Sequence, residues 1–194
     1  MNQFNPNLLQ PHSGRLDTII FQNSYLEIPE TLFYTIQIDL KEIFLADQAI
    51  ETSIILNFIR LNINRLKELE NKVFEFPVNP DEGYIDGSIL LFDVHNPFDV
   101  KKIEFSDSDH GSIDATLHFD IDFEYEDTGY EKLSDYKLKV NLSYGYLSFD
   151  EEMMAKENFT SDDIKSKVSK FASLDDYEEP EISFGQILLK MRPH

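Results

Sequence analysis

The sequence predicts an α+β fold, in which a long helix and a shorter C-terminal helix pack on one face of an antiparallel β-sheet meander. Two patterns support this class. Between residues 84 and 149, apolar and polar residues alternate in several runs separated by turn-forming residues. Two other segments, residues 47–72 and 161–174, carry apolar residues at helical spacing. With 194 residues, the chain is expected to form a single domain over residues 1–194.

The first forty residues are predicted to contain an arm and two strands. Residues 1–15 include two prolines and show no clear period, so we expect a flexible arm there. The stretch YLEIP at 25–29 is consistent with a short strand. Residues 32–40, LFYTIQIDL, are typical of a longer one, with one side formed by Leu32, Tyr34, Ile36, Ile38 and Leu40.

The long helix is expected to start after Asp47, a candidate N-cap, and to end near Lys72. Its apolar stripe would comprise Ile50, Ile54, Phe58, Leu61 and Leu69. A strand is the alternative, because the stretch IRLNIN at 59–64 also alternates. The length of the pattern and its charged tail, RLKELENK, favour the helix, and Pro77 prevents it from continuing.

The β-rich part is predicted as four antiparallel strands, at residues 84–92, 100–105, 113–126 and 136–149. Asn96-Pro97 is expected to end the first of them. Gly87 within that strand predicts a bulge or the close approach of another backbone. In the third strand, one face would carry Ile113, Ala115, Leu117, Phe119, Ile121, Phe123 and Tyr125.

The C-terminal part is predicted to contain a second helix and a last strand. Ser161 is the candidate N-cap of the helix, whose apolar stripe would be Ile164, Val168 and Phe171. The stretch ISFGQILLKM at 182–191 is consistent with a short final strand.

Acidic residues dominate the charge of the chain. It contains 37 Asp and Glu against 17 Lys and Arg, a formal net charge of -20. Residues 81–131 hold 15 of these acidic residues and, as bases, just Lys101 and Lys102. A field of this sign repels phosphate groups, so nucleic acid and anionic membranes are excluded as partners, whereas it would speed the encounter with a basic protein.

The remaining composition argues for a soluble cytoplasmic protein without a cofactor. Cysteine is absent, which excludes disulfides, a thiolate nucleophile and Cys-ligated metals. The N-terminus lacks the regions of a signal peptide, and no apolar run approaches the roughly 18 residues that span a membrane.

Motifs for catalysis or metal binding are missing. The five histidines show no metal-ligand spacing, and neither G-x-S-x-G nor a phosphate-binding glycine loop occurs. The stretch DSDHGSID at 107–114 is similar to a calcium loop, but its glycine falls at position five, and position twelve would be His118 instead of glutamate. We therefore predict a turn there, no metal site, no catalytic residue and no enzymatic activity.

The polar face of residues 113–126 is the candidate partner-binding surface. Its carboxylates would lie roughly 6.5 to 7 Å apart along the strand. Lys137 and Lys139 are expected opposite the Glu124–Glu126 end, which would leave the other end uncompensated; a merely solvated sheet face is the alternative. The predicted partner-binding residues are Asp114, Asp120, Asp122, Glu124, Glu126, Tyr125 and Tyr130.

Residues 74–105, FEFPVNPDEGYIDGSILLFDVHNPFDVKKIEF, together with the acidic strand that follows, resemble small acidic bacterial immunity-type proteins of toxin–immunity loci. The resemblance covers about half of the chain and brings no catalytic motif with it. It implies a small cytosolic protein that occludes a basic toxin domain, often a nuclease.

The leading hypothesis is therefore an acidic binding protein that neutralises a basic partner, most simply an immunity protein blocking a toxin domain. Two alternatives come from other classes. One is an enzyme with a carboxylate and histidine pocket around Asp86, Asp93, His95 and Asp99. The other is a phage or mobile-element structural protein whose subunits self-assemble. The sequence leaves the oligomeric state open.

Overall fold

The computed structural model describes residues 1–45, 48–91, 94–109, 111–150, 159–183 and 186–192. Within these residues the chain is mostly β, with one short α-helix, α2 (Ser161–Val168), and 3₁₀ turns at Pro6–Leu8, Leu66–Leu69 and Leu174–Asp176. The strands are β1 (Pro11–Asn23), β2 (Ile28–Leu40), β3 (Ile43–Leu45), β4 (Gln48–Ile50), β5 (Ser53–Ile59), β6 (Val73–Glu75), β7 (Asp86–Leu91), β8 (Val94–Asp109), β9 (Ser112–Ile121), β10 (Leu133–Phe149), β11 (Glu181–Ser183) and β12 (Gln186–Lys190).

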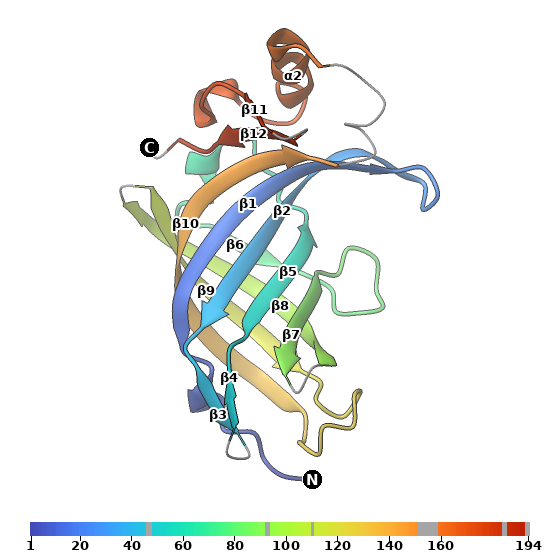
Figure 1. The fold of residues 1–194 in the computed structure, drawn as a ribbon, viewed down its shortest axis with the longest axis vertical. Helices are drawn as coiled ribbons and strands as arrows, with labels where there is room; N and C mark the ends of the chain where they lie inside the picture. Colours follow the sequence, from blue (N-terminus) through green and yellow to red (C-terminus); the bar gives the residue numbers. More distant parts are fainter. Residues whose placement is uncertain (46–47, 92–93, 110, 151–158, 184–185, 193–194) are drawn as a thin grey trace.

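Seven of these strands form a closed barrel. Neighbouring strands follow the order β1-β2-β5-β7-β8-β9-β10, and β1 then pairs with β10 to close the ring (Figure 1). The β1–β10 pairing is parallel, whereas the other neighbours in the ring are antiparallel. The predicted α+β class is therefore wrong, because the sheet buries its apolar face against itself rather than against helices.

Alternation along the strands fills the barrel interior with apolar side chains. In β9, Phe119 is fully buried and stacks on Phe98 of β8, with ring centroids 4.0 Å apart. The order expected for the β-rich part is present, since β7, β8, β9 and β10 pair successively as antiparallel neighbours. Several boundaries differ from the prediction, and two of the differences are large: β8 runs through Asn96-Pro97, and β9 ends at Ile121 rather than at residue 126.

The predicted long helix does not occur among the described residues; β5 and the 3₁₀ turn at residues 66–69 stand in its place. A β-bulge explains the error. The pairing of β2 with β5 shifts register between Tyr34 and Ile36, and Phe58 adopts a positive φ of 56°. The interior positions of β5 are Ile54, Leu56 and Ile59, so their spacings of two and three residues imitate a helical pattern. Asp47, the candidate N-cap, lies outside the described residues.

The N-terminal segment is packed rather than a loose arm. Phe4 and Leu9 are buried, and β1 already begins at Pro11. The Phe4 ring lies 4.7 Å from that of Phe123, in the connection between β9 and β10. The partner of Phe4 is more than a hundred residues away, so no local period in residues 1–15 could reveal this contact.

We use the name C-terminal segment for α2, the 3₁₀ turn at Leu174–Asp176, β11 and β12. This segment covers one end of the barrel, at the top of Figure 1, and the β3–β4 hairpin lies at the other end. A helix does occur in the predicted region, but its N-cap is Thr160, which forms a capping box with Asp163. Ile164 and Val168 of α2 are buried as expected. β12 pairs with β10, and β11 pairs with β12. No helix in the described part of the chain is long and apolar enough to cross a membrane.

Candidate functional site

The predicted partner-binding residues do not share one strand face. β9 ends at Ile121, and the Asp122 carboxylate accepts the backbone N–H groups of Glu124 and Tyr125 at 3.0 and 3.1 Å. This local cap turns the chain away from the sheet. Glu124, Tyr125 and Glu126 therefore lie in an exposed connection, where 74% of Tyr125 is accessible. The lysines of β10 face other residues than expected: the partners of Lys137 and Lys139 are His118 and Thr116.

Asp120 is a buried structural carboxylate. It is 8% exposed, lies 2.7 Å from the Lys101 ammonium and 3.6 Å from that of Lys132, and accepts the backbone N–H of Asp135 at 2.8 Å. Burial alone would raise the pKa of this carboxyl, but the Lys101 and Asp135 contacts outweigh it and lower the pKa. The expectation of uncompensated charge is thus wrong at Asp120. Asp114, on the same strand, is exposed and accepts the Asn141 amide at 2.8 Å.

Replacing Asp120 by asparagine should lower the free energy of unfolding by about 1 to 3 kcal/mol near neutral pH, because a charge-assisted hydrogen bond is lost from a largely buried site. The folded pKa of Asp120 is below its unfolded value. Its contribution is therefore present above about pH 4 and is lost as the pH falls through the folded pKa. Urea unfolding of Asp120→Asn and wild type across this range should show the difference shrinking in acid, and a difference that does not change with pH would contradict the assignment.

Tyr130 holds the N-terminal segment in place. Its ring lies 5.7 Å from Phe4 and 6.2 Å from Phe123, and its backbone bridges to that of Asn2. Half-buried in this cluster, it is positioned to stabilise the fold rather than to extend toward a partner.

A groove of about 350 Å³ brings together residues from two of the predicted sets. Asp122 and Tyr125 belong to the predicted partner-binding residues, and Asp86, His95 and Asp99 belong to the alternative enzyme pocket. Asp93, the fourth member of that pocket, lies outside the described residues. We use the name acidic groove for the hollow lined by Tyr84, Asp86, His95, Asp99, Asp122 and Tyr125.

Close approach of two backbones shapes this groove. Gly87 in β7 lies against the Phe98 carbonyl of β8, so close that a Cβ at residue 87 would overlap the carbonyl oxygen. The buried Asn96 amide donates to the carbonyls of Ile89, Leu91 and Val94 at 3.2 to 3.4 Å and thereby joins β8 to β7. At Gly87 the sequence predicted a bulge or the close approach of another backbone, and the close approach is confirmed.

The Asp99 carboxyl lies in a field of negative charge. Partial burial raises the pKa of the Asp99 carboxyl, Lys132 opposes this, and the negative charges of Asp120 and Asp122 raise the pKa again. Since Asp86 lines the same hollow, the groove presents three carboxylates of its own. A cationic group placed there would relieve this repulsion, so the groove is suited to bind positive charge.

Ser88 is a groove residue that the sequence did not single out. Its hydroxyl lies 3.3 Å from Nδ1 of His95, and Ser88 is the hydrogen-bond partner of His95 within the described residues. A serine–histidine nucleophile also needs a third group to orient the imidazole. The described residues also contain no group of three or more His, Asp or Glu side chains arranged to hold a metal ion.

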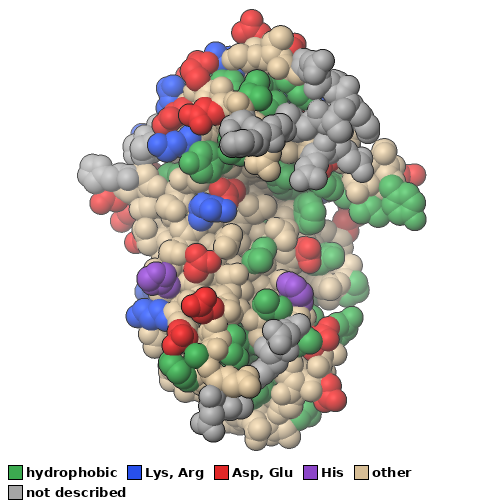
Figure 2. Space-filling model, in the orientation of Figure 1, with side chains coloured by type: hydrophobic (Ala, Val, Ile, Leu, Met, Phe, Trp, Pro, Cys, Tyr) green, Lys and Arg blue, Asp and Glu red, His purple; other side chains and the backbone are tan. Residues whose placement is uncertain are grey.

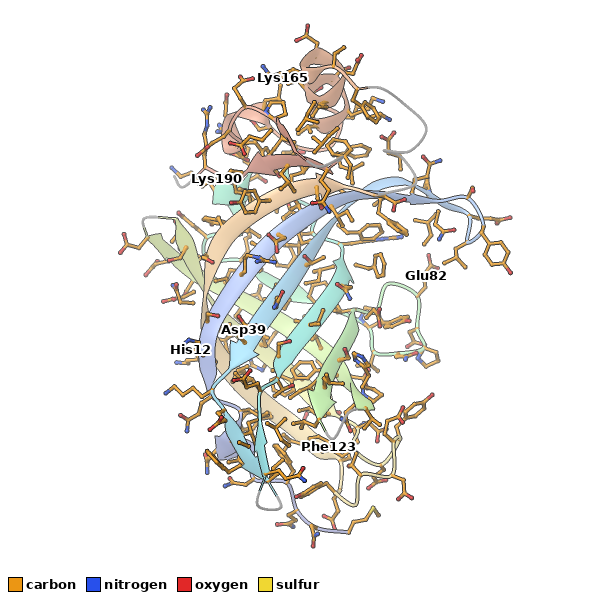
Figure 3. The ribbon with its side chains drawn as sticks, viewed as in Figure 1. His12, Asp39, Glu82, Phe123, Lys165 and Lys190 are labelled. Carbon is orange, nitrogen blue, oxygen red and sulfur yellow. The ribbon has the colours of Figure 1, made fainter. Side chains whose placement is uncertain are left out.

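A second hollow, of about 390 Å³, adjoins the acidic groove and shares Tyr84 and Asp86 with it. It lies between the β1–β2 hairpin, the end of β5 and residues 82–86. We call it the aromatic pocket; its main lining residues are Phe21, Leu26, Phe33, Phe58, Arg60 and Glu82. Figure 3 shows Glu82 on the β6–β7 connection, away from Asp39 and His12 on the wall formed by β1 and β2.

Acidic and apolar side chains lie side by side on one face of the barrel. Figure 2 shows acidic and hydrophobic side chains intermingled over this face of the barrel, whereas most of the Lys and Arg side chains that it displays gather at the upper left, around the C-terminal segment.

Comparisons of the chain with protein-family models, with curated proteins and with solved structures find no match.

Proposed function

We propose that the chain is a binding protein without catalytic activity and that its acidic groove receives a basic protein partner. One observation carries the proposal: three carboxylates converge with two exposed tyrosines in a single hollow. Tyr84 and Tyr125 are 37% and 74% exposed, and rings of this kind are frequent anchors in protein interfaces. A Lys or Arg side chain of the partner would meet the carboxylates of Asp86, Asp99 and Asp122 and would offset the repulsion that Asp99 experiences from its acidic neighbours.

The predicted partner-binding residues divide by role under this proposal. Asp122 and Tyr125 contact the partner within the groove, and the exposed Glu124 and Glu126 beside them steer its approach. Asp120 and Tyr130 support the fold beneath. Asp114 lies on the outer wall of β9, away from the groove-lining residues.

The role that fits this proposal best is that of a cytoplasmic immunity protein, which would neutralise a cationic toxin domain by covering its active site. The net charge of -20 and its concentration within residues 81–131 support this role, because long-range attraction would make capture of such a toxin fast. All three carboxylates of the groove lie in that segment.

The decisive experiment is a pull-down from the native host at low and at physiological salt. The bait is the wild-type chain or the groove variant Asp86→Asn/Asp99→Asn/Asp122→Asn. We expect the wild-type chain to recover one basic protein. At physiological salt, where distant charges are screened and direct contacts dominate, the groove variant should recover at least about tenfold less of that protein.

A matched control removes the same number of charges elsewhere. Asp107, Asp162 and Glu181 are exposed and do not line the groove. The variant Asp107→Asn/Asp162→Asn/Glu181→Gln should recover as much basic protein as wild type at physiological salt. Equal losses in the two variants would show that net charge, and not the groove, is responsible. Recovery of no basic protein at either salt would overturn the proposal.

A further inference from the structure

Three phenylalanine rings form the main part of the aromatic pocket. Phe21, Phe33 and Phe58 meet edge to face, with ring centroids 5.2 to 6.2 Å apart. All three project from the outer side of strands whose alternate residues fill the barrel, such as Ile20 and Tyr34. These rings therefore form an apolar hollow that is separate from the core of the barrel.

Backbone strain keeps one of these rings at the surface. Phe58 has a φ of 56°, in the left-handed region that bulky residues rarely adopt. The bulge lets Ile59 remain in the interior while Phe58 stays 37% exposed in the pocket. Strain of this kind persists where the surrounding structure enforces it and is concentrated at functional sites.

The charges around the pocket indicate what it receives. The Arg60 guanidinium lies 5.3 Å from the centre of the Phe33 ring, so a cation already covers one aromatic face. Glu82 and Asp86 also line the pocket, and through Tyr84 and Asp86 it continues into the acidic groove. An apolar side chain would fill the pocket, while basic residues next to it in the partner would meet these carboxylates.

We propose that the aromatic pocket is the socket for an aromatic side chain of the basic partner, flanked in the partner's sequence by Lys or Arg. This inference rests on the proposed function and adds the anchor residue to it. An aromatic side chain that is buried in a pocket and surrounded by polar groups is a common form of interface hot spot. The volume of about 390 Å³ is within the range of pockets that enclose ligand groups of this size.

Three synthetic peptides test the inference with the full chain: Lys-Lys-Phe-Lys-Lys, Lys-Lys-Ala-Lys-Lys and Glu-Glu-Phe-Glu-Glu. Binding is followed by NMR titration up to millimolar peptide. We expect the first peptide to bind about tenfold more tightly than the second, as for the loss of one hot-spot contact, and the third to be the weakest.

Variants assign the binding to the pocket. Phe58→Gly removes the ring and relieves the backbone strain, so the chain should remain folded. Leu26→Ala is the second pocket variant, because Leu26 is exposed and lines the aromatic pocket but not the acidic groove. Both should reduce binding of the phenylalanine peptide to the level of the alanine peptide and leave the latter unchanged. Asp99→Asn/Asp122→Asn should weaken both lysine peptides.

The outcomes separate the two proposals. The proposed aromatic anchor is contradicted if the phenylalanine and alanine peptides bind with equal affinity, or if the pocket variants bind both peptides with wild-type affinity. Either result leaves the proposal of a basic partner for the groove intact. If the acidic peptide binds as tightly as Lys-Lys-Phe-Lys-Lys, the pocket accepts an aromatic group without regard to charge, as a site for a neutral small molecule would, and the basic partner is overturned.

Discussion

Replacing Gly87 by alanine is expected to lower the free energy of unfolding by about 3 to 5 kcal/mol, a large part of the stability of an ordinary domain. The new Cβ would overlap the backbone carbonyl oxygen of Phe98 and would lie 3.1 Å from Cδ2 of Leu56. Neither strand can move aside freely, because β7 is paired with β5 on one side and with β8 on the other. Overpacking against a backbone atom leaves little room for relaxation.

Urea unfolding measures this effect, and another glycine supplies the control. Gly129 has a φ of 80°, and a Cβ added to it would have no neighbour within 4 Å, so Gly129→Ala introduces backbone strain without a clash. It should cost about 1 to 2 kcal/mol. If Gly87→Ala were no more destabilising than Gly129→Ala, the close approach of β7 and β8 would not constrain residue 87. Because Asp86 and Ser88 flank Gly87, the same substitution should also distort the acidic groove.

Replacing Asp176 by alanine is the second substitution with a large expected effect, about 3 to 5 kcal/mol of lost stability. Asp176 is 1% exposed, and its carboxylate accepts the backbone N–H of Leu66 at 2.8 Å and lies 3.5 Å from Nη2 of Arg65. It thereby ties the C-terminal segment to the 3₁₀ turn at residues 66–69. Alanine would leave the N–H of the buried Leu66 without its acceptor.

The neighbouring residue is a matched control for Asp176. The carboxylate of Asp175 lies at the same 3.5 Å from Arg65, but its side chain is 77% exposed. Surface ion pairs contribute little, so Asp175→Ala should change the stability by less than about 0.5 kcal/mol. Thermal or urea unfolding of both variants compares them directly. Similar losses would indicate that attraction to Arg65, and not the buried hydrogen bond, is what the C-terminal segment depends on.

Prediction from the sequence succeeded where alternation was long and regular. Strand β9 and the order of β7 to β10 follow from a period of two that a helix cannot satisfy. The helix near Ser161 was recognisable for a similar reason, since its apolar stripe is local, although its N-cap is Thr160 and not the predicted Ser161. The same reasoning failed at β5, where the bulge at Phe58 breaks the period and makes a strand resemble a helix.

The groove could be predicted only in pieces. Asp86, His95, Asp99, Asp122 and Tyr125 were each singled out, but in two unrelated hypotheses, because they lie on three segments of the chain. Their convergence depends on the pairing of β7 with β8 and of β8 with β9, together with the turn capped by Asp122. The pairing of Asp120 with Lys101 was equally hidden, since these residues occupy different strands.

The sequence by itself determined the acidity of the protein, the inward positions of β9 and the apolar stripe of α2, because composition and period depend on residues close together in the chain. Closure of the sheet into a barrel, the packing of Phe4 against Phe123 and the meeting of the acidic groove with the aromatic pocket were decided by the tertiary structure alone. Strand β1 must find β10 across more than a hundred residues, and a contact at that separation leaves no periodic trace in either segment.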